Sequence, residues 1–431
     1  MGNIRRTLNC VVGIATLAAG QLASSEAPQY QVKSIAVPTV RSGWAASINN
    51  AGEVLVNAVM QERNGESNVH AYVYRNGALQ EVVGLGGSAT VGNDINDSGQ
   101  VTGTSQIAGG GVQDQHAFVS SGGIASDLGT LGGILSWGSG INSAGDVTGY
   151  SYSTATPPTP RCFVYRDNQM SDIGGLGGTG CIGFAINDFG QIIGGGGTAT
   201  DERARAFLYD AESVIDLGSL GGTPEYPWQE WSRGNDINNR GEVVGSALTE
   251  NGATHTFLYR DGSMIDLGAV AGNYSEGLGI NEHSEVVGRS LSPQGATVAF
   301  VYADGRMVDL NTVIASRALD GRTLDEAVEI NDVGQIIANS AAGQAFLLTP
   351  LPNVFKRLSA DAWAVGKDAL SVWVDIGRAN YEALDTEGAC EALNLFDLEV
   401  TARRKAIARD VAVELLQSSE EIREALACRE G

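Results

Sequence analysis

The densest group of side chains capable of chemistry lies in one segment, Thr223–Ser232. This segment holds two carboxylates and three aromatic rings: Glu225, Glu230, Tyr226, Trp228 and Trp231. Aromatic faces beside carboxylates are suited to stacking on sugars or to gripping a peptide. Two carboxylates could instead act on a polysaccharide, but only if they face each other across one cleft at the separation that glycoside hydrolysis needs.

A second candidate group comes from a repeated position, four residues before each copy of an Ile-Asn pair. The residues there are Trp44, Val91, Trp137, Ile182, Arg233, Glu276 and Glu326. Copies arranged about one axis would bring these positions together near the mouth of a channel. The members of this candidate pocket are Trp44, Trp137, Arg233, Glu276 and Glu326. The alternative for all the tryptophans named so far is packing between neighbouring copies.

Motifs of other chemistries are not found in the sequence. His70, His116 and His255 occupy the same repeat position, so a ring would hold them too far apart to share a metal, and a structural role is expected. The aspartates of the recurrent Asp-Leu-Gly segments begin turns and lack the clustered oxygens of a calcium loop. No Cys/His spacing is typical of zinc, and no Gly-rich segment matches a phosphate loop. We therefore predict no catalytic residue, no metal and no cofactor.

The elements that would position these side chains follow from the repeat. The Ile-Asn pair occurs seven times, beginning at Ile48, Ile95, Ile141, Ile186, Ile237, Ile280 and Ile330. The Asn side chain can bond its own backbone two residues on, and a following Gly tolerates positive φ, so each pair closes a hairpin. Each copy of about 47 residues is then predicted to form four short antiparallel strands. That is the size of one blade of a β-propeller.

The two ends of the array predict a closed ring. The last copy of the third strand, at 345–348, is followed by TPLPN, where two prolines rule against a ladder strand. A strand of the missing type stands alone at 30–37, before the first copy. Pairing it with the last copy would leave no open sheet edge. We therefore predict an all-β, seven-bladed β-propeller over 21–354, closed by its N-terminal strand, rather than an open β-solenoid.

The sequence also resembles a known family. His116-Ala117-Phe118, followed by DLGTLGG at 127–133, is similar to the HAF-repeat family of predicted bacterial extracellular proteins. Related segments recur in other copies, such as AFLY with DLGSLGG, and the resemblance covers residues 30 to about 348. It implies export and a repeat β architecture. It carries no known activity to transfer, and the last copy departs from it with DLNTVIA.

Composition and the N-terminus narrow the function classes. With a net charge of −23, the chain of 431 residues is a poor partner for nucleic acid or for an anionic membrane surface. Arg5 and Arg6 precede an apolar run, 8–19, of signal-peptide length, and cleavage after Gly20 would remove residues 1–20. No later stretch is predicted to insert into a membrane. We therefore expect an exported protein, either periplasmic or secreted.

Four cysteines remain after the signal segment: Cys162, Cys181, Cys390 and Cys428. Three complete pairings are possible in an oxidising compartment, and the sequence does not choose between them. Their grouping along the chain favours Cys162 with Cys181 and Cys390 with Cys428. Free buried thiols are the alternative.

The last part of the chain, 355–431, differs from the repeats. Its apolar residues recur at helical spacing, which predicts two or three α-helices. Ser418 followed by Glu421 resembles a capping box that opens a last short helix. This tail either caps the propeller or docks a partner.

Three functions remain open. A binding propeller would recognise a glycan or an extracellular protein through its loop face. A structural or assembly protein would dock a partner through the helices of 355–431. A polysaccharide hydrolase or lyase would use carboxylates among Glu225, Glu230, Glu276 and Glu326. We predict the first of these.

Overall fold

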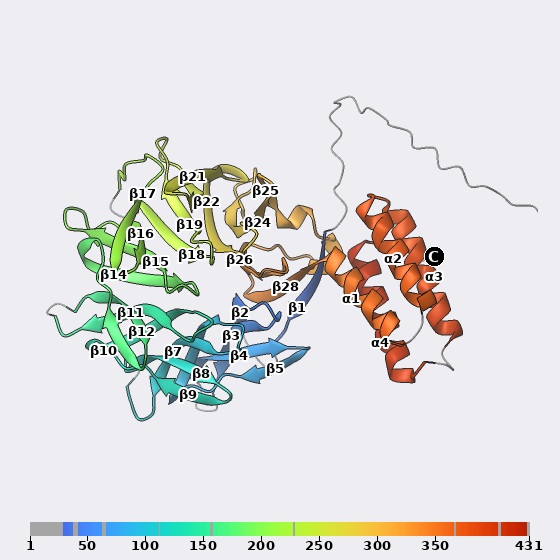
Figure 1. Cartoon of the computed structure of the whole chain (residues 1–431), viewed down its shortest axis with the longest axis horizontal. Coiled ribbons are helices and arrows are strands. Elements are labelled where there is room, and N and C mark those ends of the chain that lie inside the picture. Colours follow the sequence, from blue (N-terminus) through green and yellow to red (C-terminus); the bar gives the residue numbers. More distant parts are fainter. Residues whose placement is uncertain are drawn as a thin grey trace, which may run out of the picture.

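The computed structural model describes residues 29–37, 42–62, 66–111, 113–155, 158–226, 229–365, 368–403 and 407–428. The predicted signal segment lies outside the described residues. Figure 1 shows short strands grouped in sheets around a common centre, the arrangement of a β-propeller, with a group of helices at one side. Within these described ranges no helix is both long and apolar enough to cross a membrane.

The described strands form five sheets, of which three have four strands each. The first contains β2 (Ser42–Ile48), β3 (Val54–Gln61), β4 (Ser67–Arg75) and β5 (Ala78–Glu81). The second contains β14 (Gly177–Ile186), β15 (Ile192–Thr198), β16 (Arg205–Asp210) and β17 (Ser213–Gly218). The third contains β26 (Glu326–Ile330), β27 (Ile336–Ser340), β28 (Gln344–Pro350) and β1 (Tyr30–Ile35).

The other two sheets have eight strands each, and each joins two four-strand meanders through one parallel residue pair. One contains β6 (Gly86–Ile95), β7 (Val101–Ile107), β8 (Gln115–Ser121), β9 (Ile124–Asp127), β10 (Gly132–Ile141), β11 (Val147–Ser153), β12 (Pro160–Arg166) and β13 (Gln169–Asp172). The other contains β18 (Ser232–Ile237), β19 (Val243–Leu248), β20 (Thr254–Arg260), β21 (Ser263–Gly268), β22 (Ala271–Ile280), β23 (Val286–Leu291), β24 (Thr297–Ala303) and β25 (Arg306–Asp309). Two short 3-10 helices, Leu310–Thr312 and Ser316–Leu319, follow β25.

The predicted Ile-Asn hairpin begins each meander. Between β18 and β19, the Asn238 side-chain oxygen accepts the N–H groups of Arg240 and Glu242, both at 3.0 Å. Gly241 has a φ of 73°, which a residue with a Cβ adopts only with strain. The predicted hydrogen bond between the Asn side chain and the backbone two residues later is therefore confirmed.

The third strand of each meander supplies the core. Its aromatic residue is 0–1% exposed in six of the copies: Phe118, Phe163, Phe207, Phe257, Phe300 and Phe346. Burying one such ring stabilises the fold by about 2–3 kcal/mol. The repeated aromatic position is thus accounted for by packing between sheets.

The two ends of the strand array share one sheet. Strand β1 pairs antiparallel with β28, from Tyr30 opposite Pro350 to Ile35 opposite Ala345. Ile35 also packs in a buried cluster with Ile48 of β2, in the next sheet. The backbone pairing is the one that the sequence predicted for the segment at 30–37, and the core packing adds to it.

A repeated hydroxyl joins neighbouring meanders. Ser136 accepts the N–H of Ala117 at 2.8 Å and donates to the carbonyl oxygen of Gly129 at 2.5 Å. Ser232 and Ser275 make the equivalent pair of contacts in their own copies. This side chain therefore links the first strand of one meander to the third strand of the preceding one.

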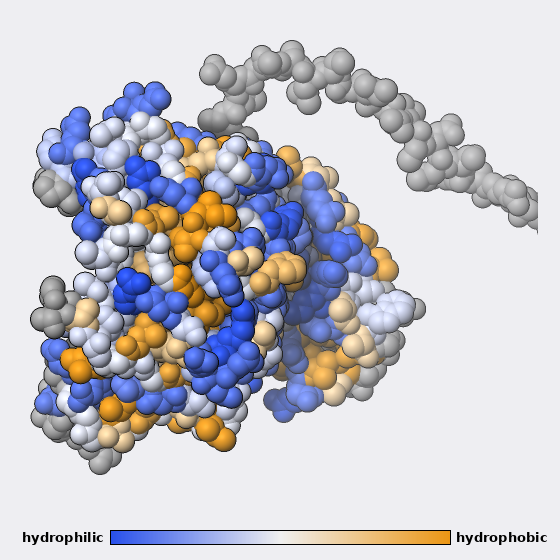
Figure 2. Space-filling view, turned by 60° about the vertical axis from the view of Figure 1, so that its left-hand side comes forward, coloured by the Kyte–Doolittle hydropathy of each residue, from blue (hydrophilic) through white to orange (hydrophobic). Residues whose placement is uncertain are grey.

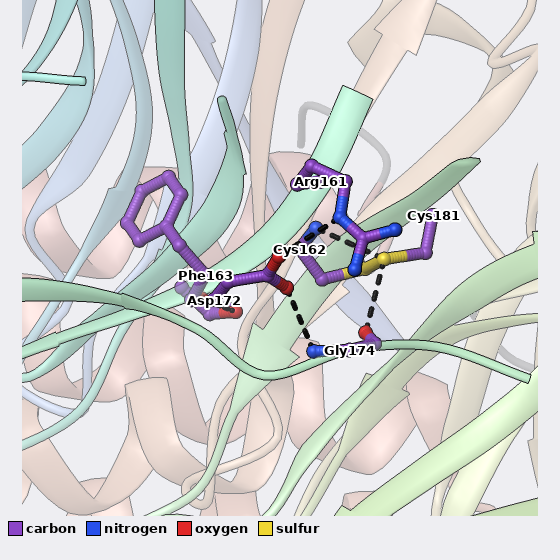
Figure 3. The surroundings of a disulfide bond; sticks show 7 residues. Arg161, Cys162, Phe163, Asp172, Gly174 and Cys181 are labelled. Carbon is purple, nitrogen blue, oxygen red and sulfur yellow. Dashed lines mark hydrogen bonds and ion pairs between the residues drawn. A yellow bond between two sulfur atoms is a disulfide. The ribbon is translucent and has the colours of Figure 1, made fainter. Parts of the chain in front are cut away.

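In one copy a cysteine takes the place of this serine. Cys181 forms a disulfide with Cys162, accepts the N–H of Cys162 at 2.9 Å and lies 3.1 Å from the carbonyl oxygen of Gly174 (Figure 3). A second disulfide joins Cys390 and Cys428. Both pairings are those that the grouping of the cysteines favoured. The first adds a covalent link at a position where other copies have only hydrogen bonds.

The tail forms four α-helices within the described residues: α1 (Leu351–Ala364), α2 (Asp368–Glu382), α3 (Thr386–Ala402) and α4 (Arg409–Ala425). This is more than the two or three predicted. Helix α1 begins four residues before the expected boundary at 355, because a proline is compatible with the first turn of a helix. The predicted capping box is wrong, since Ser418 lies well inside α4.

The helices have a core of their own, which includes Leu351, Phe355, Leu393, Phe396 and Leu415. Helix α4 also contacts the strand-built body, where Gln31 of β1 donates a 2.7 Å hydrogen bond to Glu421. Figure 2 shows the helical part standing beside the sheets, and scattered hydrophobic patches on the face toward the viewer. The tail is therefore a small helical unit seated against β1 and β28.

Candidate functional site

The Ile-Asn turns line the first candidate site. In one of them, the Asn187 side-chain oxygen accepts the N–H groups of Phe189 and Gln191 at 3.1 and 3.0 Å. Its side-chain nitrogen donates to the Gln191 side chain at 2.7 Å and to the carbonyl oxygen of Asn238, in the next turn, at 3.0 Å. All four hydrogen-bonding positions of this buried amide are occupied.

The bond to the next turn recurs in every copy. The amides donate to backbone carbonyls in the order Asn49 to Asn96, Asn142, Asn187, Asn238, Asn281, Asn331 and back to Asn49. The donor–acceptor distances lie between 2.9 and 3.2 Å. The sequence predicted only the bond inside each turn, because nothing in one copy specifies the carbonyl it meets in the next.

The turns surround a pocket of about 180 Å³ whose floor carries carboxylates that sequence reasoning did not single out. These carboxylates are those of Asp94, Asp236 and Glu329. Each accepts the backbone N–H of an isoleucine in the next copy, from Ile141, Ile280 and Ile48 respectively, at 2.8–2.9 Å. Burial raises the pKa of all three carboxyls, and the charge of Asp94 adds to the effect on the other two. The pKa of Asp236 rises to about 7.

Among the described residues, none that lines this pocket carries a positive charge. Over the part of the chain that the structure describes, no group of three or more His, Cys, Asp or Glu side chains is placed to hold a metal ion. The three carboxylates are used as hydrogen-bond acceptors between copies. The sequence could have indicated these three carboxylates by their position, because each stands immediately before the Ile of an Ile-Asn pair.

The recurrent histidines have partners within their own meanders. His116 and His255 each place Nδ1 2.9 Å from the aspartate of an Asp-Leu-Gly segment, Asp127 and Asp266. Arginines take the same position in two other copies, where Arg161 and Arg205 pair with Asp172 and Asp216. These contacts give the histidines the structural role that the sequence predicted.

The second candidate site lies four residues along the same strands from the turns, roughly 13 Å away. Each residue of the predicted pocket pairs there with a residue of the second strand: Trp44 with Asn57, Trp137 with Tyr150, Arg233 with Ser246, Glu276 with Arg289, and Glu326 with Asn339. We call these ten residues the rim. Its members share one cross-strand register, four residues before each Ile-Asn pair.

Aromatic residues gather in one part of the rim. The rings of Trp137 and Tyr150 stack with centroids 6.3 Å apart and an interplanar angle of 8°. Tyr152 meets Tyr150 edge-on at 6.2 Å. All three are half-buried, as is Trp44, which lines a shallow pocket of about 230 Å³. These tryptophans are therefore not fully enclosed between the sheets.

Charged residues form a network in another part of the rim. The Glu276 carboxylate accepts bonds from Arg289 at 2.7 and 3.0 Å, from Tyr274 at 2.9 Å and from Asn235 at 3.2 Å. Burial alone would raise the pKa of Glu276, but the Arg289 guanidinium and the hydrogen bonds from Tyr274 and Asn235 together hold that pKa below its ordinary value. Glu326 lies 3.7 Å from the same guanidinium. Glu276 is thus fixed in its charged form.

The loop before β18 adds the remaining predicted residues. Trp231 is half-buried, donates to Asp201 at 2.9 Å and carries the Arg205 guanidinium 4.3 Å from its ring centroid. Glu225 and Tyr226 are exposed, and Trp228 lies outside the described residues.

Glu230 is exposed but partly desolvated, and this desolvation raises its pKa. The charge of Arg233 opposes that rise and the charge of Glu276 adds to it, so the loop and the rim are electrostatically linked.

The structure thus links Glu230, Arg233, Glu276 and Glu326 along one side of the rim, with Arg289 between the last two. It places Trp44 and Trp137 in other sheets of the same rim. Sequence reasoning missed Tyr150, Tyr274 and Arg289. The cross-strand register of each hairpin could have found Tyr150 and Arg289, because it sets them opposite residues already selected.

Comparisons with known proteins give a general likeness. No protein-family model matches the chain, and no curated protein sequence matches it. Among solved structures it is similar to an inactive virginiamycin B lyase from Staphylococcus aureus in complex with quinupristin, at 10% identity and a TM-score of 0.44, over 74% of this chain and 99% of that one. It is also similar to TolB from Acinetobacter baumannii, at 10% identity and a TM-score of 0.38, over 74% and 96%. No residue role is transferred from either to this chain.

Proposed function

We propose that this chain is an exported, closed, seven-bladed β-propeller that binds a glycan through its rim. The observation that carries the proposal is the half-buried Trp137–Tyr150 stack, set in register with charged residues that are already fixed by hydrogen bonds. Flat aromatic faces bind the apolar faces of sugar rings, and preordered polar groups bind their hydroxyls. Few side chains would lose freedom when a sugar binds, which favours affinity.

Closure of a seven-bladed ring is supported by two sets of contacts. The asparagine amides form a chain of hydrogen bonds that returns from Asn331 to Asn49. The pairing of β1 with β28 joins the two ends of the repeat array in one sheet. Export is supported by two disulfides, which persist mainly in oxidising compartments.

The test is glycan-array binding of the intact protein beside Trp137→Ala, with Trp363→Ala as a matched control. Trp363 lies on α1 and is 62% exposed, so its loss removes an indole far from the rim. We expect the intact protein and the control to bind the same glycans, and Trp137→Ala to lose at least tenfold in affinity. Absence of glycan binding by the intact protein, or equal binding by Trp137→Ala, would overturn the proposal.

A second candidate function is supported by the surface of the tail. Trp363, Leu398 and Val413 lie on three different helices and are each more than half exposed. The tail has its own core, so these residues are not required for its packing against the sheets. A structural role, in which 355–431 docks an extracellular partner, predicts that Leu398→Ser removes a partner captured by the intact protein while glycan binding stays unchanged.

A further inference from the structure

We propose that the glycan is an acidic one, and that Arg233 and Arg205 bind the carboxylate of a uronic acid beside the rim. This inference rests on the proposed glycan-binding function and adds the chemical class of the ligand. It comes from the contact between two segments, Arg203–Ala206 and Trp231–Arg233.

Hydrogen bonds hold these two segments together. The N–H groups of Trp231 and Ser232 donate to the carbonyl oxygen of Ala204 at 3.0 and 3.4 Å. The N–H of Ala206 donates in return to the Ser232 hydroxyl at 3.0 Å. Three arginines and a tryptophan are therefore gathered at one junction between β16 and β18.

Two aromatic rings orient these arginines. The Arg205 guanidinium lies 4.3 Å from the ring centroid of Trp231, and the Arg233 guanidinium lies 4.1 Å from that of Phe184. Stacked guanidinium groups keep their N–H edges free for a planar acceptor. The arrangement orders the two cations without neutralising them.

The three arginines differ in the contacts that each already makes with a carboxylate. Arg203 makes a two-pronged contact with Asp201 at 2.8 and 3.0 Å and donates to the Pro224 carbonyl. Arg205 has a single long contact, 3.4 Å, with Asp216. Arg233 has no ion pair within 4 Å among the residues described, and its buried Nε has no hydrogen-bond partner there.

The unpartnered, buried Nε of Arg233 is set in a protein with 50 acidic and 27 basic residues. Guanidinium groups bind carboxylates through two parallel hydrogen bonds, which gives both strength and geometric selectivity. Of the nearby carboxylates, Glu276 is engaged by Arg289, and Glu230 attracts Arg233 electrostatically but forms no ion pair with it within 4 Å. A uronate carboxylate would give Arg233 the partner that it lacks, and its sugar ring would lie beside Trp231.

The experiment compares oligosaccharides of alginate, polygalacturonate and hyaluronan with their carboxyl-methyl esters by calorimetric titration. The esters keep the sugar and remove the negative charge. We expect the intact protein to bind at least one acid tenfold or more tightly than its ester. Arg233→Gln and Arg205→Gln should each reduce that preference at least fivefold.

Arg161→Gln is the matched control, because Arg161 holds the repeat position of Arg205 in another meander and pairs with Asp172 at 2.8 Å. It should keep the full preference. Thermal unfolding of each variant separates lost binding from lost folding. Equal binding of acids and esters would overturn this inference while leaving the glycan-binding function intact, whereas absence of binding to any glycan would overturn both. Tighter binding of a sulfated than of a carboxylated oligosaccharide would overturn the assignment to carboxylate.

Discussion

At the scale of single residues, the contacts made in one copy of the repeat explain the role of the equivalent residue in another copy. Ser136, Ser232 and Ser275 show which contacts a hydrogen-bonding side chain makes at their shared position. Cys181 occupies the same position, and Cys162 stands where Ala117 and Ala206 stand in other copies. The disulfide is therefore an addition to an interface that already functions without one.

We predict that Cys162→Ala/Cys181→Ser stays folded and is more stable than Cys162→Ala/Cys181→Ala by about 1 kcal/mol, the net value of a hydrogen bond. Both should be less stable than the intact protein by about 2–4 kcal/mol, because the cross-link is lost. Urea unfolding at equilibrium measures these differences. Equal stability of the two double variants would show that the serine-like contact contributes nothing.

The carboxylates of the turn pocket make stability depend on pH. The pKa of Asp236 is about 7 in the folded protein, against an ordinary value near 4. Because the folded state holds the proton more tightly, this contribution to stability is complete below about pH 4 and is lost as the pH rises through 7.

We therefore predict that the free energy of unfolding falls between pH 5 and 8, and that Asp236→Asn makes this fall shallower. The slope of stability against pH is the readout, because the new amide nitrogen must face the N–H of either Ile237 or Ile280 and so lowers stability at every pH. Asp94 and Glu329 shift in the same direction, so the fall should not vanish. Urea unfolding across this range measures the slope, and an unchanged slope in the variant would contradict the prediction.

At the scale of elements, the turns hold neighbouring sheets in place as well as reversing the chain. Asn187 fills all four of its hydrogen-bonding positions, one of them in the next copy. We predict that Asn187→Ala destabilises the protein by about 2–4 kcal/mol, since it leaves buried backbone groups without partners. Asn394→Ala, at an exposed position on α3, should change stability by less than about 0.5 kcal/mol. Comparable losses in the two variants would argue against a role for the turns in joining the sheets.

Local chemistry made the hairpins predictable from the sequence. An Asn followed by a Gly defines its turn within five residues, and the aromatic third strand marks its own burial. The tail was harder, because a proline at the start of α1 and a Ser-Glu pair inside α4 gave misleading boundary signals.

The rim was only partly predictable. Counting back from each Ile-Asn pair found the first-strand residues, but Arg289 and Tyr274 reach Glu276 through cross-strand and same-strand contacts that no single copy specifies. The carboxylates of the turn pocket were not predicted for the same reason, since the N–H groups that they accept lie in the next copy.

At the scale of the whole molecule, the first strand ties the two ends of the array together. β1 contributes pairing to β28, packing beside β2 and a contact to α4. We predict that removing residues 30–35 exposes the edge of β28 and leads to aggregation. Size-exclusion chromatography of the truncated and intact proteins would reveal it. A monomeric, cooperatively unfolding truncated protein would contradict closure by β1.

The most direct test of the account is a crystal structure of the protein with the glycan that binds best on the array. We predict a sugar ring over the Trp137–Tyr150 stack or over the Trp231–Arg233 segment, with a carboxylate on Arg233. A ligand held only in the pocket of the Ile-Asn turns, or only on the helical tail, would contradict it.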